Sequence, residues 1–173
     1  MGTTITEMAA NRPINIASPE FLRQLDAIEP GVWGTPCSIV LLDGRSFEFC
    51  LAWENPRFGD AGKWINPNCV GYLTECPKRM PAKFARSIKN AGESGMGYHI
   101  YVVRLSDGNN FVHVAGNLAI DLVDLPSGYT QRDIVGVDPH EGRERSRTEG
   151  YRRVSGHGAS VEFARPLGKA DCP

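Results

Sequence analysis

The pattern of apolar and polar positions is clearest in two segments that alternate on both sides of an Asp-Gly pair, at residues 43–44 and 107–108. An Asp-Gly pair between alternating flanks predicts a β-hairpin, because Gly adopts a positive φ at no steric cost and Asp tolerates it. We therefore expect antiparallel hairpins over residues 37–53 and 98–115.

The same alternation predicts which side chains of the hairpins share a face. Successive residues of a strand point to opposite sides of the sheet, so Phe47, Phe49 and Leu51 are expected on one face and Cys50 on the other. Phe47 and its counterpart in the second hairpin, Phe111, are expected to be mostly buried.

Two other segments have apolar residues at helical spacing. The first runs over about residues 19–29, after a suitable N-cap at Ser18 and before a Pro-Gly pair. The second runs over about residues 81–91, and Phe84 and Ile88 lie one turn apart on its apolar side. Both stripes predict helices that pack against a core.

Shorter apolar runs predict additional strands near residues 69–75, 120–125, 134–137 and 160–164. The helices are inserted between hairpins instead of alternating with single strands, which favours an α+β fold over a doubly wound parallel sheet. We expect one antiparallel, strongly twisted sheet, built from the two hairpins and the short strands, with two helices packed against it.

The length of 173 residues predicts one domain at residues 18–173, preceded by a flexible N-terminal arm at residues 1–17. Residues 138–158 have no apolar periodicity and are predicted to be an exposed or disordered loop. Phe58 and Trp64, in a loop rich in Gly, Pro and Asn, are expected to fold back on the core.

Composition narrows the class of protein. Hydrophobic residues make up 41% of the chain and charged residues 23%, as in ordinary soluble domains. The longest apolar runs are shorter than a membrane span and no signal-peptide core is evident, so we expect a cytoplasmic protein without a membrane segment. The five cysteines include no CxxC motif, which predicts free thiols, no structural zinc and no cofactor.

The net charge of −1 conceals an alternation of charge along the chain. Residues 1–60 carry a charge of −4, residues 61–104 carry +5, residues 105–142 carry −5 and residues 143–173 carry +3. If the fold keeps these blocks on different faces, the molecule can steer a charged partner; if the fold interleaves them, the surface is electrically even.

The clearest candidate for a binding site is a basic run without an acidic residue, formed by Lys78, Arg79, Lys83, Arg86 and Lys89. The last three advance by three positions along the second predicted helix, so they stay close together and away from its apolar side. They predict either a contact face for an anionic partner or an ordinary solvated helix face. Interleaved aromatic residues would favour nucleic acid, but only Phe84 lies in the run, so a protein with an acidic surface is preferred as the partner.

Two other clusters carry weaker signals. A second basic group, which either folds against a partner or stays solvated, consists of Arg143, Arg145, Arg147, Arg152 and Arg153. A group of oxygen and imidazole donors consists of Asp133, Asp138, His140 and Glu141. Nothing in the spacing of these donors forces them to converge, so no metal site is predicted.

The second predicted hairpin has a histidine on each strand, His99 and His113, within a stretch rich in Tyr and Val. This stretch resembles the histidine-bearing hairpin of NlpC/P60-type cysteine peptidases. The resemblance implies that His99 is a base, that His113 orients it, and that a cysteine attacks an amide. The alternative is that both histidines are partly buried residues of a sheet.

The nucleophile implied by this resemblance is Cys69 or Cys76. The family motif is Asp-Cys-Ser-Gly, whereas Asn68 precedes Cys69 here and Val70 follows it. Cys76 lies nearer the second helix but is followed by Pro77. Three functional hypotheses therefore remain: a non-catalytic binding module of inhibitor or immunity type, which we prefer, a cysteine hydrolase, and a nucleic-acid-binding protein.

Overall fold

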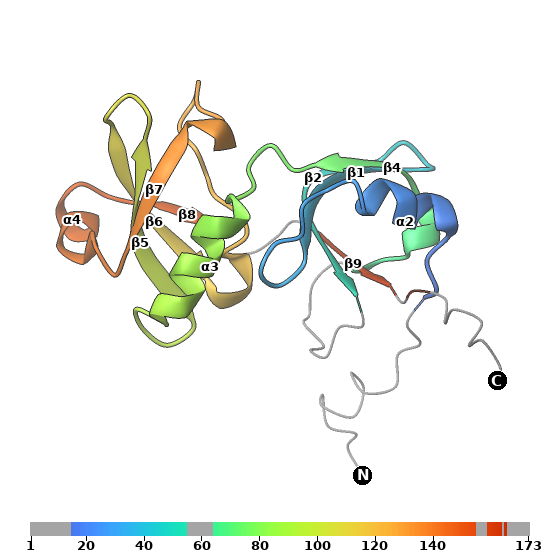
Figure 1. The fold of residues 1–173 in the computed structure, drawn as a ribbon, viewed down its shortest axis with the longest axis horizontal. Coiled ribbons are helices and arrows are strands. Elements are labelled where there is room, and N and C mark those ends of the chain that lie inside the picture. Colours follow the sequence, from blue (N-terminus) through green and yellow to red (C-terminus); the bar gives the residue numbers. More distant parts are fainter. Residues whose placement is uncertain (1–14, 55–63, 155–158, 164, 166–173) are drawn as a thin grey trace, which may run out of the picture.

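The computed structural model describes residues 15–54, 64–154, 159–163 and 165, which form an α+β fold of two lobes (Figure 1). The fold class predicted from the order of helices and hairpins is confirmed. The strands form two sheets, however, where a single sheet was expected. Each sheet packs a helix on one face and has its own buried apolar cluster.

The first lobe contains a five-stranded sheet in the order β3-β9-β2-β1-β4 and helix α2 (Pro19–Leu25). Its strands are β1 (Thr35–Leu41), β2 (Ser46–Glu54), β3 (Trp64–Ile65), β4 (Val70–Glu75) and β9 (Ala159–Phe163), with a 3₁₀ turn, η1 (Pro67–Cys69), before β4. β9 pairs in parallel with β2 and β3, so the strand predicted near residues 160–164 joins this sheet.

Helix α2 begins where its sequence predicts. The Ser18 hydroxyl accepts the backbone N–H of Phe21 at 3.2 Å, and Phe21 and Leu25 are buried against the sheet. The Gln24 side-chain oxygen accepts the N–H of Leu73 at 2.8 Å, on the edge strand β4. This bond satisfies a backbone donor that an edge strand would otherwise leave to solvent or another chain.

The first predicted hairpin is present, but a bulge changes the faces of its side chains. β1 and β2 pair antiparallel, and Gly44 adopts φ 86° in the turn. The register shifts between Cys37 and Ile39. As a result Phe47 packs on the same core cluster as Cys50, whereas Phe49 packs on another, so the predicted grouping of Phe47 with Phe49 was wrong.

The second lobe contains a four-stranded sheet in the order β7-β5-β6-β8. Its elements are α3 (Ala82–Ala91), β5 (Tyr98–Leu105), β6 (Asn110–Gly116), β7 (Ile134–Pro139), α4 (Arg143–Thr148) and β8 (Arg152–Val154), with 3₁₀ turns η2 (Asn117–Ala119) and η3 (Gln131–Asp133). β5 pairs antiparallel with both β6 and β7, as the second hairpin predicts, and β8 joins β6 in parallel.

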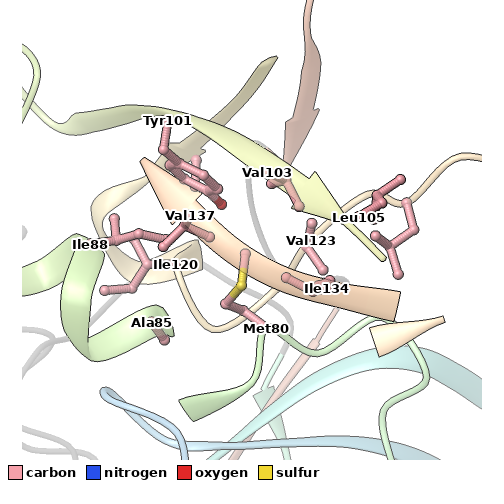
Figure 2. Close-up of a cluster of buried hydrophobic side chains, with 12 residues drawn as sticks. Met80, Ala85, Ile88, Tyr101, Val103, Leu105, Ile120, Val123, Ile134 and Val137 are labelled. Carbon is pink, nitrogen blue, oxygen red and sulfur yellow. The ribbon is translucent and has the colours of Figure 1, made fainter. Parts of the chain in front are cut away.

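Helix α3 covers one face of this sheet, and the core lies between them (Figure 2). Its buried side chains include Met80, Ala85, Ile88, Tyr101, Val103, Leu105, Ile120, Val123, Ile134 and Val137. Ile88 is fully buried as predicted, and Phe84 is partly buried. Phe47 and Phe111 keep only a minor part of their surface exposed and pack on the two core clusters, as expected of residues that are mostly buried.

Several other expectations require correction. Part of the loop expected at residues 138–158 forms α4 and β8, and residues 155–158 lie outside the described residues. The strand expected at residues 120–125 is an irregular segment with an isolated bridge. Ala17, assigned to the flexible arm, is 3% exposed. Residues 1–14, Phe58 and the Trp64 side chain lie outside the described part of the chain.

The carboxylate of Asp121 links the two lobes. Asp121 lies between η2 and β7 in the second lobe, is fully buried, and accepts the N–H groups of Val32 (2.6 Å) and Trp33 (2.8 Å) from the loop before β1. A Cβ atom on Gly31 would lie 2.5 Å from the Asp121 carboxyl carbon, so only Gly fits this close approach. The loop at residues 31–34 is therefore held against the second lobe.

Within the described residues, no helix combines the length and apolar character needed to cross a membrane.

Candidate binding site

Helix α3 exposes three basic side chains. Lys83, Arg86 and Lys89 are exposed, while Ala82, Ala85 and Ile88, each one position earlier along the helix, are buried. The two sets interleave because residues three apart stay on the same side of a helix. We call Lys83, Arg86 and Lys89 the basic face. No acidic residue lies in the first turn of α3, so the helix does not neutralise them itself.

No side chain of the basic face forms an ion pair with a carboxylate within the described residues. Every ion pair in that part of the chain involves a cation outside the basic face. Its ammonium groups instead lie over aromatic rings. Lys83 Nζ is 4.5 Å from the centre of the Phe84 ring, and Lys89 Nζ is 4.1 Å from that of Trp33. The positive charge of this surface is therefore available to an anionic partner.

The second basic cluster differs in this respect. On α4, Arg145 pairs with Glu149 at 2.9 Å and Arg147 pairs with Glu144 at 3.3 Å. Arg152 on β8 pairs with Asp124 at 3.2 Å. Arg143 donates to the Ser94 carbonyl oxygen, and neither it nor Arg153 has a carboxylate partner in the described residues. Three of the five guanidinium groups are thus compensated by local carboxylates, whereas none of the three cations of the basic face is.

Lys78 and Arg79 stand apart from the basic face. Arg79 is 1% exposed and its guanidinium group contacts Glu75 at 2.9 Å and Glu29 at 3.3 Å, so it joins the two lobes from the inside. Lys78 is 39% exposed, lies 3.9 Å from Asp124 and sits over an aromatic ring of β2. The burial of Arg79 removes it from the candidate face.

Trp33 is a component that sequence reasoning did not place at this site. It is 37% exposed and lies under Lys89, although it comes from the loop before β1. The bond from its N–H to Asp121 fixes this position. The local sequence Gly-Val-Trp-Gly does not predict that Trp33 contacts α3, because this contact depends on a carboxylate 88 residues away.

Two histidines satisfy carbonyl groups at the C-terminal end of α3. His99 Nδ1 contacts the Gly92 carbonyl oxygen at 3.0 Å, and His140 Nε2 contacts the Ala91 carbonyl oxygen at 2.9 Å. Burial is the main cause that lowers the pKa of His99. His140 Nδ1 is 3.1 Å from the Ser94 hydroxyl, a pair that sequence reasoning also missed.

His113 is fully buried and structural. Its Nε2 accepts the backbone N–H of Asp124 at 3.0 Å, which places the proton of the neutral ring on Nδ1. Burial lowers the pKa of His113 to about 4, so the ring is neutral at physiological pH.

The structure does not assemble the pairs implied by the peptidase resemblance. The Cys76 thiol is fully buried and donates to the Glu48 carbonyl oxygen, and burial raises its pKa to about 11. Cys69 is exposed on η1 in the first lobe. In the described part of the chain, no hydrogen bond joins a cysteine sulfur to the ring of His99 or His113.

The donors considered for a metal take part in other contacts. Asp133 caps η3 through Thr130, Asp138 pairs with Arg104 at 3.1 Å, and His140 binds the end of α3. The described residues contain no group of three or more His, Cys, Asp or Glu arranged to hold a metal ion.

Comparison with known proteins finds no matching family model, curated protein or solved structure. The interpretation of the site therefore depends on its own geometry and charge.

Proposed function

We propose that this chain is a non-catalytic binding protein, of inhibitor or immunity type, whose basic face binds an acidic surface of another protein. The observation that carries the proposal is the exposure of Lys83, Arg86 and Lys89 without a carboxylate partner in the described residues. Arg145 and Arg147 of α4, which pair with carboxylates, provide the contrast within the same lobe.

A protein partner is preferred to nucleic acid for two reasons. The chain has a net charge of −1 and a pI of about 6.4, whereas nucleic-acid-binding domains are usually strongly basic. Nucleic-acid affinity at physiological salt also rises with the number of phosphates neutralised, and three cations neutralise few. Three cations are sufficient to orient and steer an acidic protein surface.

The test is a charge reversal with a matched control. The first variant combines Lys83→Glu, Arg86→Glu and Lys89→Glu. The control combines Arg23→Glu, Arg45→Glu and Arg147→Glu, which changes the net charge equally at exposed positions away from the basic face. Each protein is used to capture partners from a lysate of the source organism, and the captured proteins are quantified by mass spectrometry.

We expect the native chain and the control to enrich the same protein. In the reversed variant the enrichment of that protein should be at least about tenfold lower, which corresponds to a loss of about 1.4 kcal/mol of binding free energy. Binding by the native chain should weaken with added salt, and this dependence should flatten in the reversed variant. Equal capture by all three proteins contradicts the proposal. A single-stranded oligonucleotide that the native chain shifts and the reversed variant does not would assign the face to nucleic acid.

A further inference from the structure

Three exposed apolar side chains adjoin the C-terminal end of α3. Met96 is 95% exposed in the turn that connects α3 to β5, Tyr98 opens β5 with 36% exposure, and Trp33 lies under Lys89 in the last turn of the helix. We call Trp33, Met96 and Tyr98 the end patch. Trp, Tyr and Met are the residue types enriched at the centre of protein interfaces. The end patch therefore has the composition of an interface centre, and Lys89 of the basic face contacts it at Trp33.

The turn that carries Met96 is held by a dense set of hydrogen bonds. The Glu93 carboxylate accepts the N–H of Gly97 at 2.9 Å and a hydrogen bond from the Asn117 side chain. These bonds hold the pKa of Glu93 below its usual range, so the carboxylate stays charged. The N–H of Ser94 donates to the Tyr98 carbonyl oxygen at 3.0 Å across the turn.

His140 attaches the same turn to the rest of the lobe. Its ring contacts both the Ala91 carbonyl oxygen and the Ser94 hydroxyl, and that hydroxyl accepts the N–H of Ile100 at 2.8 Å. His140 has φ 65°, a left-handed conformation that residues other than Gly rarely adopt. Such a conformation persists where the surrounding contacts determine it, and the hydrogen bonds of His140 and Ser94 hold the turn in this shape in the free chain.

We propose that this turn is a preformed recognition loop, and that Met96 inserts into an apolar pocket on the acidic protein that binds the basic face. The inference rests on the proposed function, because the charge of Lys83, Arg86 and Lys89 defines the partner. A loop backbone that is already held in place loses little conformational freedom on binding, so more of the free energy from burial of its tip contributes to affinity. The unbranched, flexible side chain of Met suits a pocket of irregular shape.

The first test places an aliphatic diazirine amino acid at position 96 and irradiates the chain in a lysate of the source organism. We expect a crosslink to one protein, at an apolar residue whose neighbours on the surface are Asp or Glu. The yield should fall at least about tenfold when Lys83, Arg86 and Lys89 are reversed to Glu. The same probe at Val135, an exposed residue on β7, is the control and should not reach that protein.

The second test measures the affinity of the purified crosslinked protein for variants at position 96. Met96→Ala should weaken binding about tenfold, equivalent to about 1.4 kcal/mol, without changing the salt dependence, and Met96→Leu should restore most of the affinity. Val135→Ala should leave the affinity unchanged.

The outcomes separate this inference from the proposed function. If Met96→Ala binds like the native chain while charge reversal abolishes binding, the recognition loop is overturned and the proposed function stands. If charge reversal leaves binding intact, both are overturned. Crosslinks mainly to nucleic acid, or to polar residues scattered over many proteins, also overturn the recognition loop.

Discussion

The ionisation of His113 shows how a single residue depends on its surroundings in the fold. Its imidazole ring is enclosed between β6 and the segment at Asp124, with no exposed surface. A buried neutral imidazole is stable while it stays neutral, and adding a proton there requires placing a charge in a region without water. The unfolded chain takes up that proton freely.

We therefore predict that the free energy of unfolding decreases as the pH falls from about 6.5 to about 4. The pKa of His113 is about 4 in the folded chain and near 6.5 when unfolded, so the unfolded state binds more protons in this window. Above pH 6.5 both states leave His113 neutral and the free energy of unfolding is at its full value. By pH 4 the protonation of His113 in the unfolded chain lowers this free energy by about 3 kcal/mol. Burial also lowers the pKa of His99, which acts in the same direction.

Urea denaturation of the native chain and of a His113→Phe variant, at several pH values, measures this effect. The variant is less stable throughout, because the N–H of Asp124 loses its acceptor. Its unfolding free energy should nevertheless change less between pH 6.5 and pH 4. Equal slopes for the two proteins would show that His113 does not cause the acid sensitivity.

The second hairpin illustrates how a local signal determines an element. Gly108 has φ 88° and its N–H donates to the Leu105 carbonyl oxygen, which closes the turn between β5 and β6. A Cβ atom there meets no other group within 4 Å, so any cost of adding one comes from the backbone conformation alone. For a residue with a Cβ atom this left-handed conformation costs about 1–2 kcal/mol.

We predict that Gly108→Ala lowers the free energy of unfolding by about 1–2 kcal/mol. Gly116→Ala, at the end of β6, is the matched control because Gly116 has φ −65° and its nearest neighbour would lie 3.9 Å from the new Cβ atom. The control should change stability by less than about 0.5 kcal/mol. Chemical denaturation of both variants measures these free energies of unfolding. If both variants lose the same amount of stability, the turn does not require Gly at position 108.

Across the whole molecule, the contact between the lobes combines an apolar cluster, in which Phe49 of β2 packs on Ala119 and Leu122, with a few buried polar groups. Asp121 accepts two backbone N–H groups of the other lobe, and burial raises its pKa while those N–H groups and Arg79 oppose the shift. Arg79 bridges to Glu29 and Glu75, and Cys76 donates to Glu48 on β2. The thiol of Cys76 is thus enclosed where the two lobes meet.

We predict that Asp121→Ala destabilises the chain by about 3 kcal/mol, because the N–H groups of Val32 and Trp33 become buried without an acceptor. It should also speed the reaction of Cys76 with iodoacetamide, since the thiol becomes accessible when the lobes separate. In the native chain Cys69 should react before Cys76, because Cys69 is exposed and Cys76 is buried. Asp121→Asn keeps one acceptor oxygen, so its free energy of unfolding and its rate of Cys76 labelling should lie between those of the native chain and Asp121→Ala.

Mass spectrometry of the labelled peptides follows both cysteines in one experiment. An unchanged labelling rate for Cys76 in Asp121→Ala would mean that the lobes are held together by other contacts. Rapid labelling of Cys76 in the native chain, lost in a His99→Ala variant, would instead support the cysteine hydrolase.

The sequence by itself determined the features that neighbouring residues control. The Asp-Gly pairs predict both hairpins, Ser18 predicts the start of α2, and the three-residue spacing of Lys83, Arg86 and Lys89 places them on one side of α3. Each of these depends on φ preferences, capping or helical periodicity, which operate over a few residues.

Only the tertiary structure decided which of these residues meet. From the sequence, Arg79 is indistinguishable from the other cations of the basic run. In the structure it is buried and pairs with Glu29, which lies 50 residues away in the sequence. Trp33 reaches Lys89 because Asp121 holds its loop. The bulge in β2, where Glu48 and Phe49 both lie opposite Ser38, reverses the face of Phe49 and leaves the apolar pattern of the sequence unchanged. Such contacts arise from the packing of distant segments, so local propensity contains no information about them.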